Sequence, residues 1–185
     1  RSTVPGVVIG AVLVSVAAVV GLALALRALG GLGLSTAGIV TAGLITWGLG
    51  GDVPASVWNP FIVALPFACF LALAVATVAN RRTLLPWVLA VGSFVMQTHL
   101  SYVGLVGRIT AGAIGVVTWR GWRNADERLG GERLAAESLG VLVVLWMVPI
   151  WQQLTGHPGN LGQIVRSALG PGGDTAGTTA LGELG

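Results

Sequence analysis

The sequence contains no lysine and few charged residues of any kind. Only 9% of its 185 residues are charged, whereas a soluble domain usually carries roughly 25%. Hydrophobic residues make up 54% of the chain, and the mean hydropathy is +0.85. This composition excludes an ordinary soluble domain and indicates an integral membrane protein.

The sequence also has a single cysteine and no cluster of basic residues. These two features argue against disulfide-rich, zinc-binding and nucleic-acid-binding proteins. The single cysteine, Cys69, lies in an apolar run and cannot build a disulfide framework or a zinc site. Neither His99 nor His157 has a partner at metal-ligand spacing, so we expect no metal and no cofactor. The net charge is +3 and the arginines are scattered between apolar runs, so we expect no nucleic-acid partner.

Long apolar runs are what the sequence does contain. A membrane-spanning helix needs about 20 mostly apolar residues. The first candidates are Val4–Leu29, Leu32–Leu49 and Val57–Ala79. The glycine pair Gly30–Gly31 separates the first two, and the polar segment Gly50–Ser56 separates the second from the third. The sequence therefore predicts three helices joined by short turns.

The apolar run from Leu84 to Trp119 is too long for a single crossing. Its 36 residues would form about 54 Å of helix, against a hydrocarbon core of about 30 Å. We expect it to fold back at the polar segment Thr98–Tyr102. This predicts helices over Leu84–Gln97 and Val103–Trp119.

A polar loop is expected over Arg120–Ser138, and a last apolar helix over Leu139–Trp151, which "ERLAAES" upstream could extend. The fold class is therefore all-α, a polytopic transmembrane helix bundle with about six membrane helices. Residues 1–166 form the transmembrane helical region. Residues 167–185 are a polar, glycine-rich tail or the start of an extracytoplasmic segment. Because the chain begins at Arg1 without a methionine, we interpret it as an internal fragment of a larger membrane domain.

The arginines predict the orientation in the membrane, because cytoplasmic loops are enriched in positive charge. If the loop at residues 80–83 is cytoplasmic, alternation places the Gly30–Gly31 turn and the Arg120–Ser138 loop on the same side. That side then holds Arg27, Arg81, Arg82, Arg120, Arg123, Arg128 and Arg133. The other side holds Arg1 and Arg166, and Arg108 lies inside a span. This bias supports the predicted layout, with the arginine-rich side in the cytoplasm.

Three polar clusters fall on the predicted outer side, and they supply the candidate site residues. The residues are Trp58, Asn59, Gln97, His99, Tyr102, Gln152, Gln153, His157 and Asn160. Several convergent polar groups are what a ligand site requires. The structural alternatives are an interface-anchoring tryptophan, an Asn59 helix cap before Pro60, and a simple turn at "HPGN".

His99 and Arg108 are the sharpest candidates, and each has two interpretations. His99 is either a loop histidine at the membrane interface or a hydrogen-bonding or acid–base group in a surface site. Arg108 lies about 9 Å along the helix from Tyr102. A charge inside a span is costly and usually functional. It either snorkels to an interface or binds a lipid phosphate, which matches its planar guanidinium.

A family resemblance is carried by three segments together. They are "VWNPFIVALPFACFLALA", "LPWVLAVGSFVMQTHLSYV" and "LWMVPIWQQLTGHPGNLGQIVR". Their order and spacing resemble actinobacterial polytopic membrane proteins that are similar to the GT-C superfamily of glycosyltransferases. The resemblance covers roughly Val57 to Arg166.

The resemblance implies that the chain is a fragment of a membrane enzyme. Such enzymes transfer a sugar from a polyprenyl-phosphate carrier to an acceptor outside the cytoplasm. Their catalytic base, an acidic residue in the first outward loop, would precede Arg1, so we assign no catalytic residue here. His99 and Arg108 are then candidates for the carrier phosphate, and Trp58 and Tyr102 for the sugar or lipid.

Gln152 departs from the family pattern, in which a glutamate often occupies this position. Glutamine keeps the hydrogen bonding and loses the charge, so activity in this chain would be altered if the carboxylate matters. Two alternatives remain open: a segment of a membrane transporter or permease, and a noncatalytic membrane subunit. A transporter would place polar groups near the midplane, often in two related halves, and the sequence shows no internal repeat.

Overall fold

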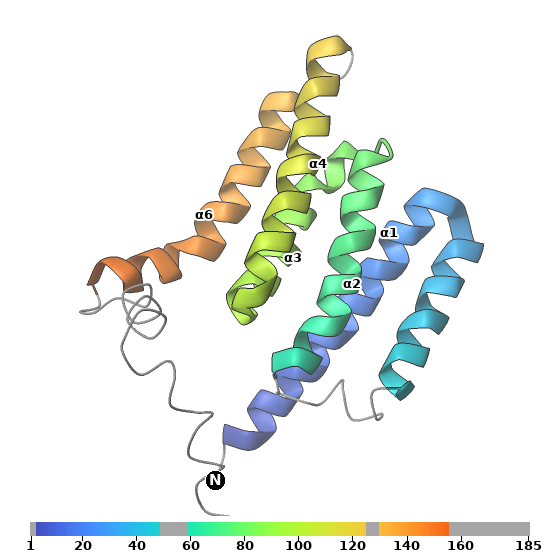
Figure 1. Cartoon of the computed structure of the whole chain (residues 1–185), viewed down its shortest axis with the longest axis vertical. Coiled ribbons are helices and arrows are strands. Elements are labelled where there is room, and N and C mark those ends of the chain that lie inside the picture. Colours follow the sequence, from blue (N-terminus) through green and yellow to red (C-terminus); the bar gives the residue numbers. More distant parts are fainter. Residues whose placement is uncertain (1–2, 49–58, 125–129, 156–185) are drawn as a thin grey trace, which may run out of the picture. The chain divides into compact units, whose positions relative to one another are not determined.

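The structure, a computed structural model, describes residues 3–48, 59–124 and 130–155. All regular elements in these ranges are helices (Figure 1). They are α1 (Thr3–Gly48), α2 (Asn59–Val78), η2 (Arg82–Leu84), α3 (Leu85–Thr98), η3 (Leu100–Tyr102), α4 (Val103–Arg123) and α6 (Gly131–Thr155). The chain divides into two units, Arg1–Leu142 and Val143–Gly185, and the boundary falls inside α6.

Helix α1 is two antiparallel arms that meet at the predicted glycine turn (Figure 1). Gly30 and Gly31 have non-helical backbone angles, and Gly31 adopts φ 74° and ψ −159°, a region open essentially to glycine. Across the turn, the Ser35 hydroxyl donates to the carbonyl of Ala23 at 2.9 Å. The expectation of two helices separated at Gly30–Gly31 is therefore confirmed.

Four threonine hydroxyls in α1 and α2 bond to their own helix. In the second arm of α1, Thr36, Thr41 and Thr46 each donate to the carbonyl four residues earlier, at 2.9 Å. The fully buried Thr77 of α2 does the same to Leu73 at 2.8 Å. Each hydroxyl is thereby satisfied without a partner from another helix, which suits an apolar environment.

Helix α2 ends in a Schellman motif centred on Asn80. The Asn80 N–H donates to Thr77 O at 3.4 Å, and the Arg81 N–H donates to Ala76 O at 3.0 Å. Asn80 has φ 102°, a value that asparagine tolerates better than most residues. The motif turns the chain so that Arg81 Nε reaches the carbonyl of Ala28 on α1, at 3.2 Å.

The long apolar run folds back where the sequence predicts. Helix α3 ends at Thr98, His99 is extended with φ −146° and ψ 113°, and α4 begins at Val103 after the 3-10 turn η3. The predicted bounds of α3, Leu84–Gln97, differ from the observed ones by one residue at each end. Helix α4 continues to Arg123, beyond the predicted Trp119.

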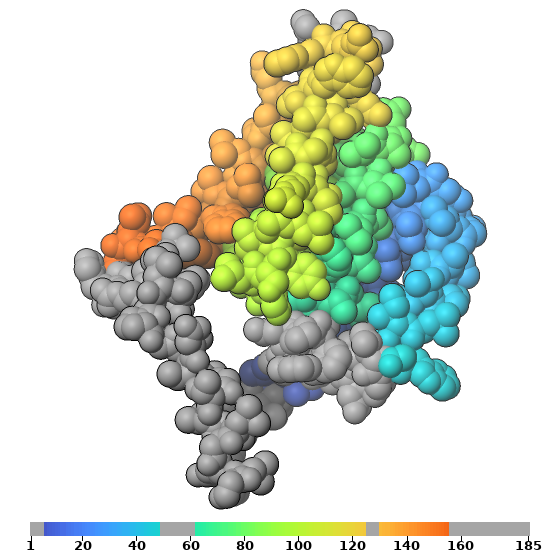
Figure 2. All heavy atoms as spheres, in the orientation of Figure 1, coloured from blue at the N-terminus to red at the C-terminus, as the bar shows by residue number. Residues whose placement is uncertain are grey.

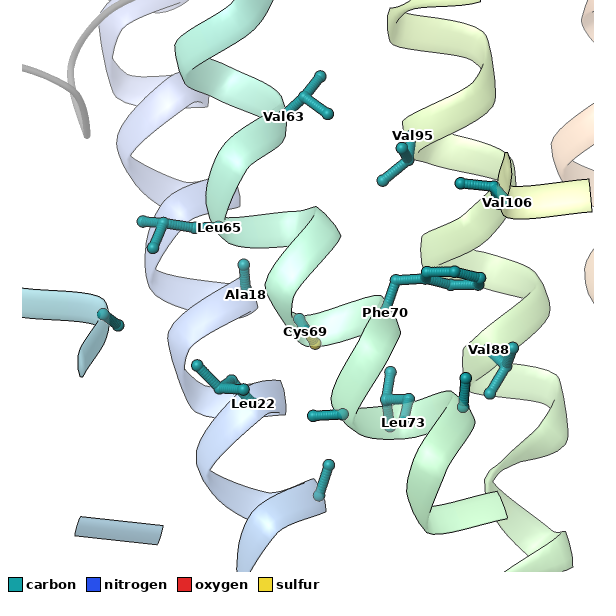
Figure 3. Packing of buried hydrophobic residues seen from close by; sticks show 14 residues of the cluster. Ala18, Leu22, Val63, Leu65, Cys69, Phe70, Leu73, Val88, Val95 and Val106 are labelled. Atoms are coloured by element: carbon teal, nitrogen blue, oxygen red, sulfur yellow. The ribbon is translucent and has the colours of Figure 1, made fainter. Parts of the chain in front are cut away.

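The core of the first unit lies where α2 packs against α1, α3 and α4 (Figure 3). Phe70 is fully buried and lies among the buried valines Val63, Val88, Val95 and Val106. Gly92 of α3 permits this packing, because a Cβ there would lie 3.0 Å from the Phe70 ring and 3.2 Å from Val106. Close approach at small residues is the usual way in which membrane helices associate.

The predicted loop Arg120–Ser138 is wrong in extent. Helix α4 runs through Arg123 and α6 begins at Gly131, so a helix replaces most of the loop. The segment "ERLAAES" is rich in strong helix formers, and buried Leu134 packs against Leu85 and Leu89 of α3. The expectation that "ERLAAES" could extend the last helix is therefore confirmed, whereas the loop was predicted too long.

Three described helical segments are long and apolar enough to cross a membrane. They are Gly6–Gly48, which contains the turn of α1, Leu100–Arg123 and Gly131–Thr155. The described apolar part of α2, Ile62–Val78, is shorter. This all-helical, apolar architecture supports an integral membrane protein.

Candidate functional site

Arginines gather at one end of the first unit, which we call the arginine end. It comprises the α1 turn, the α2–α3 turn, the end of α4 and the start of α6. The Arg81–Ala28 hydrogen bond joins the first two. A pocket of about 270 Å³ joins the others, because Arg82, Trp122 and Gly131 all line it. The three turns that alternation places on one side of the membrane therefore do lie together.

Side chains at the arginine end interact in ways expected of a membrane surface. The Arg123 guanidinium lies over the Trp119 ring, 4.9 Å from its centroid. Arg133 forms an exposed ion pair with Glu137, with Nε 2.8 Å from Oε1. Tryptophan and arginine side chains together are typical of a bilayer–water interface. Arg128 of the predicted cytoplasmic set lies outside the described residues.

The α3–α4 turn, Thr98–Tyr102, lies at the opposite end, because α3 begins and α4 finishes at the arginine end. Hydrogen bonds to the backbone hold part of it. The Thr98 hydroxyl donates to Phe94 O at 2.7 Å, and the Tyr102 N–H donates to His99 O at 3.1 Å. In contrast, His99 Nδ1 is buried and has no hydrogen-bond partner among the described residues.

An aromatic series links this histidine to the core. The rings of His99 and Tyr102 meet edge to face, with centroids 5.7 Å apart. Tyr102 packs against Phe67 of α2 at 4.8 Å, and Phe67 stacks on Phe70 at 6.3 Å. Such contacts hold aromatic rings in fixed orientations. His99 and Tyr102 are therefore positioned together, as the sequence predicts for neighbours in one turn.

The remaining predicted site residues lie in several different parts of the chain. Gln97 is exposed at the end of α3, two residues before His99. Asn59 begins α2, in agreement with a place at the helix start, but its side chain lies outside the description. Gln152 and Gln153 are in the second unit, on α6. Trp58, His157 and Asn160 lie outside the described residues, as does the turn residue Asp52.

Arg108 lies on a different face of α4 from the core contacts. Val106 is buried against α2 and α3, and Arg108, two residues later, is rotated by about 200° around the helix. Its side chain is exposed, and it has no ion-pair partner in the described ranges. Figure 2 shows α4 with an uncovered face. The structure therefore separates Arg108 from His99 and Tyr102.

An apolar groove between α1, α2 and α3 is a feature that sequence reasoning missed. Its volume is about 560 Å³, and its lining includes Gly21 and Leu24 of α1, Cys69 of α2, and Trp87 and Phe94 of α3. Small residues spaced along α1 (Ala17, Ala18, Gly21 and Ala25) leave this space beside the helix. The spacing of these small residues is the sequence feature from which the groove could have been predicted.

No known family, curated protein or solved structure matches the chain. Among the described residues, no three histidine, cysteine, aspartate or glutamate side chains lie together in a way that could hold a metal ion. Function is therefore inferred from the geometry of the membrane helices, the His99–Tyr102 pair and the arginine end.

Proposed function

We propose that the chain is the membrane-embedded part of a bacterial plasma-membrane protein, with about six crossings and the arginine end in the cytoplasm. The six segments are the two arms of α1, then α2, α3, α4 and α6. The gathering of arginines from three separate turns at one end supports this orientation, because cytoplasmic ends carry the positive charge. Helix α3 spans about 21 Å and reaches across only with its flanking turns.

The orientation predicts which engineered cysteines react from outside the cell. In a Cys69→Ala background, Ser101→Cys is expected to react with a membrane-impermeant maleimide in intact cells. Thr83→Cys is expected to react only after permeabilisation. Both positions are exposed, so access to the reagent decides the difference. Labelling of Thr83→Cys in intact cells, with Ser101→Cys protected, would reverse the proposed orientation.

Within this frame, we propose a glycosyltransferase role, in which the protein passes a sugar from a polyprenyl-phosphate carrier to an extracytoplasmic acceptor. The observation that carries the proposal is the buried, unpartnered Nδ1 of His99 beside Tyr102, at the end away from the arginines. A buried polar atom without a partner is costly. A hydrogen bond from His99 to the carrier phosphate or sugar would satisfy it.

The roles of the individual residues follow from their positions. His99 contacts the polar head of the carrier, and Tyr102 offers a ring face and a hydroxyl to the sugar. Arg108 lies further along α4 on its exposed face, where it contacts the phosphate only if the carrier lies along that face. We assign no catalytic base to the described residues.

Substitution of His99 tests this role. His99→Ala is expected to lower sugar transfer about 10- to 100-fold, the loss expected when a hydrogen bond to a charged group is removed. Tyr102→Phe is expected to have a smaller effect because it keeps the ring. Transfer is measured in membranes containing the full-length protein and a polyprenyl-phosphate sugar.

The control is Ser101→Ala, an exposed position in the same turn. It is expected to leave transfer unchanged. Full transfer by His99→Ala at normal expression would refute the role of His99, whereas equal losses in both variants would indicate damage to the turn.

One observation favours a second function, that of a noncatalytic membrane subunit. The exposed face of α4 carries Arg108 together with Gly104, Gly112 and Gly115, and a Cβ at any of these glycines would meet nothing within 4 Å. Small residues on an open face suit packing against another membrane helix. For such a subunit, His99→Ala would leave function intact.

A further inference from the structure

The groove between α1, α2 and α3 has the dimensions and lining of a site for a hydrocarbon chain. Its volume of about 560 Å³ lies within the range of about 300–1,000 Å³ for small-molecule sites. Every residue that lines it is apolar. A hydrocarbon chain therefore suits the groove.

The walls of the groove are open to the side of the first unit, where membrane lipid would lie. Leu24 is 60% exposed and Trp87 is 62% exposed, although both line the groove. Cys69 and Leu73 of α2 form its floor between the two walls; Figure 3 shows them on α2 between α1 and α3. A lipid chain can enter such a groove laterally from the bilayer.

Two arginines stand at the end of the groove that reaches the arginine end. Val20 and Leu24 line it on α1, and Arg27 continues their spacing one turn further along the helix. On the opposite wall, Leu84 lies three residues after Arg81. Arg81 Nε bonds to the carbonyl of Ala28, the neighbour of Arg27. The Arg81 guanidinium is thus held against the part of α1 that carries Arg27.

These two positive charges have no acidic partner in the described part of the chain. The described acidic residues are Glu132 and Glu137, both on α6, and Glu137 pairs with Arg133. Neither Arg27 nor Arg81 takes part in an ion pair there. The bond to Ala28 uses one of the five N–H donors of the Arg81 guanidinium. The site lacks an anion, and phosphate oxygens match guanidinium donors well.

We propose that the groove binds an anionic phospholipid of the surrounding bilayer, with one acyl chain along α1 and α3 and the phosphate held by Arg27 and Arg81. The exposed indole of Trp87 lies at the same level, where tryptophan normally meets lipid headgroups. Basic pockets between membrane helices on the cytoplasmic side are suited to such headgroups. This site lies at the opposite end from the His99–Tyr102 pair and does not depend on the glycosyltransferase proposal.

The test measures lipid retention by the full 185-residue chain, purified in mild detergent and analysed by native mass spectrometry. The probes are phosphatidylglycerol and phosphatidylcholine with identical acyl chains. Arg27→Gln is expected to weaken phosphatidylglycerol binding about fivefold, and Arg27→Gln with Arg81→Gln roughly 25-fold. Phosphatidylcholine carries the same phosphate but is neutral overall, so its binding is expected to be weaker and to fall less in these variants.

Two further variants distinguish the contribution of the lipid headgroup from that of the acyl chain and from that of positive charge in general. Ala17→Phe, which fills the groove from an exposed position on its α1 wall, is expected to reduce retention of both lipids. Arg133→Gln removes an arginine of the same end outside the groove and is expected to change nothing. Thermal unfolding of each variant shows whether the fold is kept, and Arg27→Gln, at an exposed position, does not disturb the Arg81–Ala28 bond.

Three results would overturn the proposal. Unchanged phosphatidylglycerol binding in folded Arg27→Gln would remove the headgroup contact. Unchanged binding in Ala17→Phe would show that the lipid lies elsewhere. Failure of the unaltered chain to retain either lipid would mean that another part of the protein or a partner helix fills the groove.

Discussion

Replacement of Phe70 by alanine is expected to lower the free energy of unfolding by about 3–5 kcal/mol. The side chain is fully buried where α2 meets α3 and α4, in contact with the Gly92 and Val106 region. Packing contacts supply much of the attraction between membrane helices, because lipid tails are as apolar as the core. A cavity at this junction therefore removes interactions that the bilayer does not replace.

The measurement is equilibrium unfolding of the detergent-solubilised chain by increasing mole fractions of dodecyl sulfate, followed by tryptophan fluorescence. The matched control is Leu71→Ala on the same helix, where the side chain is 38% exposed. Its loss is expected to be about 1 kcal/mol or less. Similar losses in the two variants would mean that Phe70 is not at the centre of a packed core.

Gly31→Ala is expected to destabilise the first unit by about 1–3 kcal/mol. Gly31 has φ 74° and ψ −159° at the turn between the two arms of α1. A residue with a Cβ reaches this conformation only with steric strain. This strain comes from the backbone conformation and not from a clash with neighbouring side chains, since a Cβ at Gly31 would meet no atom within 4 Å.

Gly33→Ala, two residues later, is expected to act in the opposite direction. Gly33 is helical and its Cβ would also meet nothing within 4 Å, so alanine raises helix propensity by up to about 1 kcal/mol. The same unfolding assay compares the two variants. Equal changes of the same sign would show that the α1 turn does not depend on the backbone freedom of Gly31.

The turns were predictable because each has a local cause. The Gly30–Gly31 pair ends a helix through backbone freedom, and the segment Thr98–Tyr102 concentrates polar groups in a run too long for one crossing. The alternation of helix direction and the charge of the arginines were enough to predict that the arginine-bearing turns lie at the same end. These predictions needed only local chemistry, helix length and the approximate thickness of a bilayer.

What failed depends on contacts between distant helices. The loop Arg120–Ser138 was predicted too long, because the packing of Leu134 against α3, which holds the start of α6, joins segments far apart in the sequence. The groove arises from small residues on α1 facing Cys69 and Trp87, and no single segment shows that these meet. The exposure of Arg108 could not be predicted either, because it depends on which side of α4 faces the core.

The threonines of the second arm of α1 have a consequence for how a cell handles this chain. Hydropathy scales count each hydroxyl as exposed to its surroundings, yet Thr36, Thr41 and Thr46 return theirs to backbone carbonyls of the same arm. Once helical, the arm presents mainly methyl groups and hydrocarbon to the lipid. Its transfer from the insertion machinery into the bilayer should therefore be easier than residue-by-residue transfer scales suggest.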